Sequence, residues 1–258
     1  MPVSDLDLLI DAALKAGEIA LKHKKDGLDV TDKPGDAGPV TQADLAVDQA
    51  LREGLTAARP DIAWLSEETA DDLGRLSSDR VFIVDPIDGT RSFIAGEKTW
   101  AHSLALVEDG RVVHGVVFLP ELDLMYHASH GQGAFCNDEP LCVAKNTDVQ
   151  VAEVLATKPN MEPKHWRGTV PDFKRAHRPS LAYRLCLVAQ GRYDAMLTLR
   201  PSWEWDIAAG VLILQEAGAT VTDRHGETLT FNNASRQTAG VLGAAPDLHK
   251  QIADRLVY

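Results

Sequence analysis

One short segment constrains the fold of this 258-residue chain more than any other. Residues 85–90 read Asp-Pro-Ile-Asp-Gly-Thr and directly follow four apolar residues, Val81 to Val84. Four apolar β-formers in a row suit a strand that is covered on both faces. Pro86 lacks the N–H that a sheet ladder needs, and Gly89 permits a positive φ, so we expect the strand to stop at Pro86 and the chain to turn. The sequence therefore predicts that Asp85 and Asp88 lie at the end of a buried strand.

Two further acidic residues lie at the ends of apolar segments. Glu67 comes after the short apolar run Ile62 to Leu65, and Asp206 opens a segment whose apolar residues recur at helical spacing. Alone, Glu67 would be a solvated surface acid and Asp206 a residue of a helix start. If these two converge with Asp85 and Asp88, the repulsion among four carboxylates requires cations, and hard oxygen ligands select Mg²⁺ or a similar ion.

Other interpretations of the central motif can be tested on spacing. An isolated Asp-x-x-Asp-Gly would by default be a turn in which each Asp bonds its own backbone. Haloacid dehalogenase phosphatases separate two Asp by one residue, whereas two residues separate Asp85 from Asp88. In an EF-hand count that starts at Asp85, Ile87 and Gly89 fall at ligand positions and Gly96 at the position of the terminal Glu, so that interpretation fails.

Three motifs, in this order along the chain, resemble those of the inositol monophosphatase family. They are Glu67-Glu68, the segment 85–90, and Trp205-Asp206-Ile207-Ala208-Ala209-Gly210. That family comprises Mg²⁺-dependent, lithium-sensitive phosphomonoesterases that act on inositol phosphates, 3′-phosphoadenosine 5′-phosphate, histidinol phosphate and related small substrates. The similarity extends from the Pro39-Val40-Thr41-x-x-Asp44 stretch to the final helix. It implies an α+β fold, a layered α-β-α-β-α sandwich, and a homodimer.

The resemblance also implies two metal-binding sets that share one carboxylate. The ligands would be Glu67, Asp85 and the backbone carbonyl of Ile87 for one Mg²⁺, and Asp85, Asp88 and Asp206 for the other. Members of the family often admit a third, mostly hydrated metal, which would lie near Glu67 and Glu68. The cofactor expected from the resemblance is therefore Mg²⁺, two or three ions per site.

Catalytic and phosphate-binding roles follow from the same resemblance. Thr90, paired with Asp44, would orient the attacking water, with Glu67 in the catalytic set, and the backbone N–H groups of Gly89 and Thr90 would hold the phosphate. The assignment agrees with the chemistry, because phosphate monoesters need accelerations up to ~10²¹ and two metals activate water while stabilising the leaving oxygen. A glycine beside a ligand lets backbone N–H groups approach an anion closely.

Asp44 and Lys33 each have a competing structural interpretation. Thr41 and Asp44 have the spacing of a capping box at the start of a helix that runs to about Ala58, so Asp44 is predicted either to cap or to catalyse. Residues 31–39 are rich in turn formers and should be mobile. They form either a plain surface loop or a lid, in which Lys33 would reach toward the phosphate or a metal-bound water.

Periodicity predicts mixed helices and strands, and the length of 258 residues suits one large domain or two lobes that share an interface. A helix begins near Ser4, and strands at 103–107, 112–118 and 124–128 follow one another, with a hairpin signal at Asp109-Gly110. Strands near 154–157 and 195–199 alternate with helices near 181–190 and after Asp206. We expect an N-terminal α+β lobe, 1–145, that carries most metal ligands, and a C-terminal α/β lobe, 146–258, that supplies Asp206 and the substrate contacts.

Substrate signals in the sequence disagree. Glu204 precedes Trp205-Asp206, a pattern similar to the bacterial 3′-phosphoadenosine 5′-phosphate phosphatases, whereas Thr90-Arg91-Ser92-Phe93 is closer to inositol or histidinol phosphatases. Glu204 is predicted with equal weight to contact a substrate hydroxyl or ribose, or to face solvent. Arg184 and Arg200 are weaker predictions for a second phosphate or a carboxylate, since most arginines are surface charges.

Composition excludes several function classes. A net charge of −12 argues against binding of nucleic acid or of an anionic membrane over a broad surface. Three cysteines without a Cys-x-x-Cys pair, and an N-terminus without a signal peptide, indicate a cytoplasmic protein. The leading hypothesis is a Mg²⁺-dependent phosphatase for inositol monophosphate or phosphoadenosine phosphate, with histidinol phosphate as the alternative substrate. The hypothesis from another class is a noncatalytic phosphate-binding or regulatory protein of the same fold.

Overall fold

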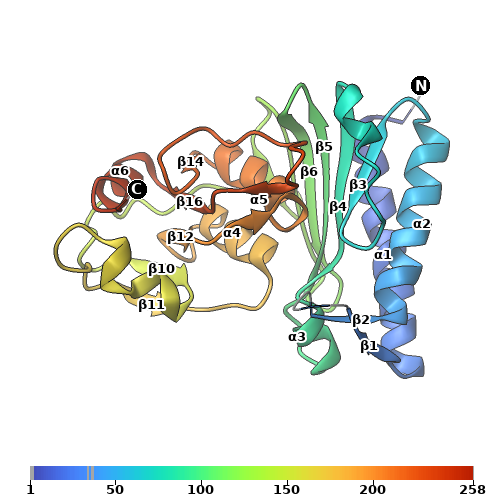
Figure 1. Cartoon of the computed structure of the whole chain (residues 1–258), viewed down its shortest axis with the longest axis horizontal. Coiled ribbons are helices and arrows are strands. Elements are labelled where there is room, and N and C mark those ends of the chain that lie inside the picture. The colour runs from blue at the N-terminus through green and yellow to red at the C-terminus, as the bar shows by residue number, and fades with distance from the viewer. Residues whose placement is uncertain (1–2, 34, 36–37, 258) are drawn as a thin grey trace.

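The computed structural model describes residues 3–33, 35 and 38–257, and in this part of the chain helices and sheets alternate in layers. The helices are α1 (Asp5–Asp26), α2 (Gln42–Ala58), α3 (Thr90–Ile94), α4 (Leu181–Ala189), α5 (Glu204–Glu216) and α6 (Pro246–Ala253), with short 3₁₀ turns at Gly74–Ser77, Lys158–Met161 and Pro163–His165. In Figure 1, α1 and α2 cover one face of the larger sheet, and α4 and α5 lie between the two sheets. Helix α6 packs on the far side of the smaller sheet. The predicted α-β-α-β-α sandwich is confirmed.

The larger sheet has seven strands in the order β3-β4-β5-β6-β7-β8-β9. They are β3 (Ala63–Ser66), β4 (Arg80–Asp88), β5 (Ala101–Glu108), β6 (Arg111–Leu119), β7 (Leu124–Ser129), β8 (Ala134–Cys136) and β9 (Glu139–Pro140). Strand β3 runs parallel to β4, and Ser66 lies opposite Val84. Because parallel strands end at the same edge of a sheet, this register brings the following residues, Glu67 and Asp85, to one place.

Strand β4 does not stop at Pro86, contrary to the sequence-based expectation, but continues to Asp88. Asp85 lies opposite Ser103 and Asp88 opposite Ala101, so β4 uses one residue more than β5 between these pairs, which is a β-bulge. A bulge tolerates the missing N–H of Pro86. Residues three apart would point to opposite faces of a regular strand, and the extra residue returns Asp85 and Asp88 to the same face.

The antiparallel meander predicted after residue 100 is confirmed. Strands β5 and β6 form a hairpin, and Asp109 (φ 47°) and Gly110 (φ 76°) both adopt the left-handed conformation at its turn. Two positive φ values match the right-handed twist of the adjoining strands, which is why Asp-Gly is a strong hairpin signal. The helices predicted near Ser4, at 42–58 and at 181–190 are present as α1, α2 and α4.

The smaller sheet has five strands in the order β11-β10-β12-β16-β14. They are β10 (Glu153–Ala156), β11 (Lys174–Ala176), β12 (Ala195–Thr198), β14 (Thr220–Thr222) and β16 (Val241–Ala244), and two short ribbons pair β1 (Val30–Asp32) with β2 (Pro39–Thr41) and β13 (Ser202–Trp203) with β15 (Gln237–Thr238). The chain passes from one sheet to the other between residues 140 and 153. The two-lobe division stays a prediction, and the buried core shared by both sheets is continuous around α5.

Helix α5 packs closely against both of its neighbours. A methyl group on Gly115 of β6 would come 2.8 Å from the carbonyl oxygen of Ala209, and one on Gly210 would come 2.8 Å from Leu185 of α4. Small residues at these contacts let the backbone of α5 approach the larger sheet and α4 directly. The position of α5, and therefore of Asp206 in its first turn, is set by these contacts.

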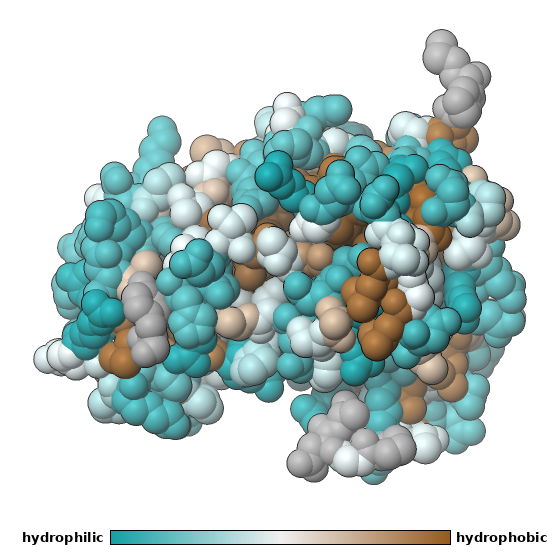
Figure 2. Space-filling view, turned by 45° about the horizontal axis from the view of Figure 1, so that its top comes forward, coloured by the Kyte–Doolittle hydropathy of each residue, from teal (hydrophilic) through white to brown (hydrophobic). Residues whose placement is uncertain are grey.

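The face of the molecule seen in Figure 2 is mostly polar. In Figure 2 hydrophilic residues cover most of the visible face, and hydrophobic residues occur in small separate groups. Within the described residues, no helix combines the length and the apolar composition that crossing a bilayer requires. Of the three free thiols, Cys136 and Cys186 are buried and Cys142 is exposed.

We predict that Gly115→Ala lowers the free energy of unfolding by roughly 1–3 kcal/mol, because the new methyl group overpacks the contact between β6 and α5. Urea unfolding followed by circular dichroism measures this change. The matched control is Gly54→Ala in α2, where a methyl group meets no atom within 4 Å, and it should raise the free energy by roughly 0.5–1 kcal/mol. Equal stabilities of the two variants would contradict the close packing of α5.

Candidate active site

A pocket of about 1270 Å³ opens where the end of β4 meets the start of α3 and the first turns of α4 and α5. Most of the site residues expected from the sequence line this one pocket: Lys33, Glu67, Asp85, Ile87, Asp88, Gly89, Thr90, Arg184 and Asp206. Two others lie directly behind the lining, since Asp44 bonds Thr90 and Glu68 bonds Lys33. Residues from positions 33 to 206 of the sequence are thus gathered around one cavity.

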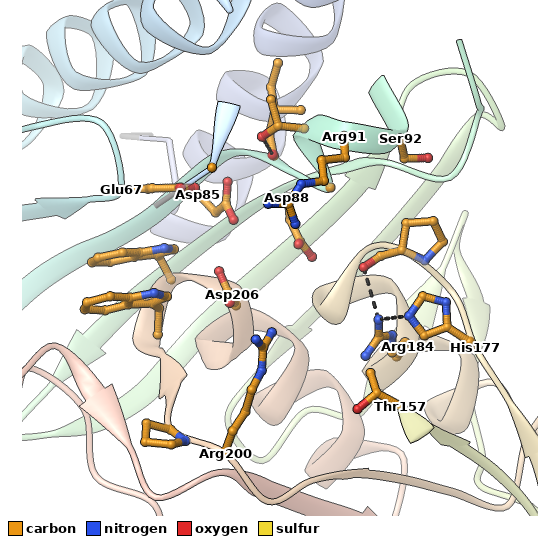
Figure 3. Close-up of a pocket in the computed structure, with 18 of the residues that line it drawn as sticks. Glu67, Asp85, Asp88, Arg91, Ser92, Thr157, His177, Arg184, Arg200 and Asp206 are labelled. Atoms are coloured by element: carbon orange, nitrogen blue, oxygen red, sulfur yellow. Dashed lines mark hydrogen bonds between the residues drawn. The ribbon is translucent and has the colours of Figure 1, made fainter. Parts of the chain in front are cut away.

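The centre of the pocket is a cluster of carboxylates. Oxygen atoms of Asp85, Asp88 and Asp206 all lie within 4.8 Å of one another. Figure 3 shows these three side chains pointing toward a common space, with Glu67 beside Asp85. The β-bulge supplies Asp85 and Asp88, the parallel partner strand supplies Glu67, and the first turn of α5 supplies Asp206.

Burial and mutual repulsion make this cluster costly without a cation. Burial, followed by the charges of Glu67 and Asp88, raises the pKa of Asp85 well above its ordinary range. Burial and the charge of Asp88 do the same to the pKa of Asp206. Within the described residues, the buried Oδ1 of Asp85 has no hydrogen-bond partner. A buried acceptor without a donor, beside two further carboxylates, fits a divalent ion with oxygen ligands.

Asp88 is held by the start of α4. Its Oδ2 accepts bonds from the hydroxyl of Ser180 at 2.6 Å and from the backbone N–H of Ala182 at 2.7 Å. Burial raises the pKa of Asp88 to about 6, while these two bonds and the charge of Arg184 oppose the rise. Since both bonds go to Oδ2, the carboxylate is fixed in orientation and Oδ1 remains for the pocket.

The first turn of α5 is anchored on both sides. The hydroxyl of Ser103 in β5 donates to the backbone carbonyl of Trp205 at 2.9 Å. Glu204 is fully buried, and its two oxygens accept the backbone N–H groups of Asn232 and Asn233 at 2.8 Å each. The side-chain amide of Asn233 adds a third bond to Glu204 at 2.7 Å.

This geometry corrects the expectation for Glu204. The predicted substrate contact is wrong, because Glu204 turns away from the pocket and both of its oxygens are occupied by the 232–233 loop. The solvent-facing alternative is also wrong, because the side chain is buried. Both interpretations assumed that Glu204 is accessible. Its hydrogen bonds instead connect the first turn of α5 to the loop at residues 232–233.

Asp44 forms the predicted helix cap and also contacts Thr90, and its catalytic role stays a prediction. One oxygen, Oδ2, accepts bonds from the N–H and the hydroxyl of Thr41, which completes the capping box at the start of α2. The other, Oδ1, lies 3.3 Å from the hydroxyl of Thr90, which also lies 3.1 Å from the carbonyl of Ile87. A single buried carboxylate therefore connects the helix cap to the pocket. Burial raises its pKa.

Lys33 contacts two carboxylates at the mouth of the pocket. Its ammonium group donates to Glu67 at 2.7 Å and to Glu68 at 2.6 Å. Burial and the charge of Glu67 raise the pKa of Glu68 to about 7, although the bond from Lys33 opposes this. Of the predicted lid, residues 34, 36 and 37 lie outside the described residues, and the flanking residues form the β1–β2 ribbon.

Two residues that the sequence did not single out support the site. Ser180 binds Asp88 and also caps α4 by accepting the N–H of Tyr183. The buried ring of His102 bonds the carbonyl of Pro86 at the bulge, and burial lowers the pKa of His102 to about 4, so the ring is neutral. The N-cap role of Ser180 is visible in the sequence, but neither contact to β4 has a local signal.

The sequence and the fold of the chain resemble those of known proteins. The model of the inositol monophosphatase family matches residues 3–257. An inositol-1-monophosphatase of Rhizobium meliloti is 35% identical over 238 residues, 86% of each chain, and a 3′(2′),5′-bisphosphate nucleotidase of Shigella flexneri is 31% identical over 88% of this chain and 93% of its own. A solved inositol monophosphatase structure from Thermotoga maritima, 29% identical, superposes with a TM-score of 0.82 over 96% of this chain and 95% of that one.

We predict that the free energy of unfolding of the metal-free protein falls as the pH rises from about 4 to about 7. The pKa values of Asp85, Asp88, Asp206 and Glu68 are raised on folding, so the native state binds protons more tightly than the unfolded state. Their stabilising contribution is complete below the ordinary carboxyl pKa and disappears as the pH rises through the folded values. Urea unfolding in the presence of a chelator, at a series of pH values, measures the fall.

Two controls assign this pH dependence to the cluster. Asp88→Asn should reduce the slope, because one titrating carboxylate is removed, whereas Asp11→Asn on the exposed face of α1 should leave it unchanged. Saturating Mg²⁺ should abolish the fall, because it binds the ionised native cluster. A metal-free protein that gains stability over the same pH range would contradict the assignment.

We also predict that Glu204→Ala lowers the free energy of unfolding by about 2–5 kcal/mol, because it leaves the buried donors of Asn232 and Asn233 without an acceptor. Thermal and urea unfolding measure the loss. Glu139→Ala at an exposed position of β9 is the matched control and should change stability by less than about 0.5 kcal/mol. A stable Glu204→Ala variant with altered substrate preference would restore the substrate role.

Proposed function

The chain belongs to the inositol monophosphatase family, and we propose that it is a Mg²⁺-dependent hydrolase of small phosphomonoesters. The observation that carries the proposal is the convergence of Asp85, Asp88 and Asp206 in the pocket, where one carboxylate oxygen of each lies within 4.8 Å of the others. Relatives named for phosphatase activity support the reaction class.

The residues suited to hold the metals form the two sets expected from the family. They are Glu67, Asp85 and the carbonyl of Ile87 for one ion, and Asp85, Asp88 and Asp206 for the other, with Glu68 near a third. The unpartnered Oδ1 of Asp85 would be available to a metal ion. When bound, Mg²⁺ would compensate the clustered negative charge, acidify water and stabilise the developing charge on the leaving oxygen.

Thr90 and Asp44 would orient the attacking water and receive its proton. The Thr90 hydroxyl has two acceptors within reach, Asp44 at 3.3 Å and the Ile87 carbonyl at 3.1 Å, and it can donate to one while accepting from water. Two bonds from Thr41 hold the Asp44 carboxylate in place. Its burial favours the protonated form, which suits a group that takes up a proton during the reaction.

The phosphate would be bound by the backbone N–H groups of Gly89 and Thr90. Gly89 has φ 96°, a conformation that side chains with a Cβ rarely adopt, and it immediately precedes α3. The first N–H groups of a helix have no acceptor within it, so they remain for an oxyanion. Lys33 now pairs with Glu67 and Glu68. When substrate binds, it would leave these carboxylates and place its positive charge near the phosphate.

Inositol monophosphate and 3′-phosphoadenosine 5′-phosphate are the main substrates proposed, with histidinol phosphate as the alternative. The names of the relatives from Rhizobium meliloti and Shigella flexneri support the first two. A panel that compares inositol 1-phosphate, phosphoadenosine phosphate and histidinol phosphate by phosphate release would rank them.

We predict that phosphate release from this panel requires Mg²⁺ and that Asp88→Asn lowers kcat/KM by at least about 100-fold, since even outer partners of a metal site cost 10–100-fold. Asp11→Asn is the matched control and should retain wild-type activity. Calorimetric titration with Mg²⁺ separates loss of metal binding from loss of fold. If the wild-type protein releases no phosphate from any of the three compounds with Mg²⁺, the chain is instead a noncatalytic member of the fold.

A further inference from the structure

We propose that Arg184 and Arg200 form a subsite for a second oxyanion on the substrate, a phosphate or a carboxylate that is not hydrolysed. The inference rests on the proposed function, because it concerns another wall of the same pocket. Its consequence is a preference for substrates with two anionic groups over substrates with one.

The first support is the charge balance of the pocket. Although the chain carries a net charge of −12, cationic side chains outnumber carboxylates in the pocket lining. The cations are Lys33, Arg91, Arg184, Arg200, Arg224 and Arg236, and the carboxylates are Glu67, Asp85, Asp88 and Asp206. Once divalent ions compensate the carboxylates, the arginines leave the pocket strongly positive. Such a pocket attracts substrates of high negative charge.

The second support is the fixed position of Arg184. It is a buried residue, and its Nη2 lies 2.8 Å from Nε2 of His177 and 3.3 Å from the carbonyl of Pro179. Its Nε donates to the carbonyl of Arg178. Burial, followed by the charge of Arg184, lowers the pKa of His177, so His177 accepts as a neutral ring. All of these partners are neutral, so none of them neutralises the guanidinium.

The free edge of Arg184 faces the pocket. Among the contacts of the described residues, its Nη1 has no hydrogen bond. A guanidinium that is held by three neutral acceptors and retains an open N–H edge is already ordered for an oxyanion. Binding therefore costs little side-chain entropy at this residue.

The third support is the position of Arg200, which follows β12 and is exposed. Figure 3 shows its side chain rising into the pocket toward Asp206, with Arg184 on the neighbouring wall. Across the described residues, no hydrogen bond or ion pair engages its guanidinium. Burial lowers the pKa of Arg184, the charge of Asp88 opposes this shift, and the charge of Arg200 adds to it, so the two guanidinium groups are close enough to repel. An oxyanion between them would remove that repulsion.

The arrangement separates the two anions of a substrate in space. The carboxylates come from the end of β4, the residue after β3 and the first turn of α5, whereas the arginines come from α4 and from the segment after β12. At about 1270 Å³ the pocket is larger than the ~300–1,000 Å³ of common small-molecule sites, so it has room for a substrate with two anionic groups. The second oxyanion would then fix which phosphate meets the metals.

Two matched substrate pairs test the subsite and identify the oxyanion. Adenosine 3′,5′-bisphosphate against adenosine 3′-monophosphate varies a phosphate, and 2-phosphoglycerate against glycerol 2-phosphate varies a carboxylate. We expect kcat/KM of the wild-type protein to favour the doubly anionic member of at least one pair by about 10- to 100-fold, the range of a charge-assisted bond. The pair in which the doubly anionic member is preferred identifies the oxyanion that the arginines bind.

Two variants assign the preference to the arginines. Arg200→Gln, at an exposed position, should bring the ratio of kcat/KM within the favoured pair close to one, and Arg184→Gln should do the same if thermal unfolding shows that it is folded. Arg52→Gln on the exposed side of α2 is the matched control and should keep the wild-type ratio.

The outcomes separate this inference from the proposed function. Hydrolysis of all four compounds with equal kcat/KM within each pair overturns the subsite but leaves the phosphatase intact. A preference that survives in Arg200→Gln overturns the role of that arginine. If none of the four compounds is hydrolysed in Mg²⁺, the proposed function fails and the subsite fails with it.

Discussion

Electrostatic repulsion among buried carboxylates is the constraint on which the rest of this structure depends. Asp85, Asp88 and Asp206 hold oxygen atoms within 4.8 Å of one another, and burial raises the pKa of each above its ordinary range. Clustered carboxylates oppose folding unless protons or cations compensate them. Three features hold the region around the cluster in place: the bulge in β4, the capped start of α4 and the two anchors of α5.

The anchors fix orientation, and the two bonds to Asp88 also oppose the rise of its pKa. Ser180 and the N–H of Ala182 bind one oxygen of Asp88, and Ser103 binds the first turn of α5 through the Trp205 carbonyl. Glu204 ties the same turn to the loop at 232–233. Preorganised ligands lose little entropy when a cation binds. A bound cation would also relieve the repulsion among the carboxylates. The repulsion that lowers the stability of the free protein would thus favour the binding of a cation.

The pocket has two electrostatic regions that complement each other. We propose that the acidic region binds cations together with a phosphate and that the arginine region binds a second negative group. Each region contains like charges that repel until a ligand of the opposite sign arrives. A substrate that satisfies both regions is selected by the spacing between its anions as well as by its chemistry.

The resemblance to a known family predicted the layered fold and the carboxylates that gather in the pocket. The sequence by itself determined the hairpin at Asp109-Gly110, the helix cap at Thr41 and the strand that carries Asp85. These features are encoded locally, by apolar periodicity, turn chemistry and a motif at a strand end. Only the tertiary structure decided that β4 continues through Pro86 to Asp88, that Glu204 is buried against Asn232 and Asn233, and that Ser180 holds Asp88. These outcomes depend on which distant partners surround a residue, and pairing between residues far apart in the chain leaves no periodic trace in its sequence.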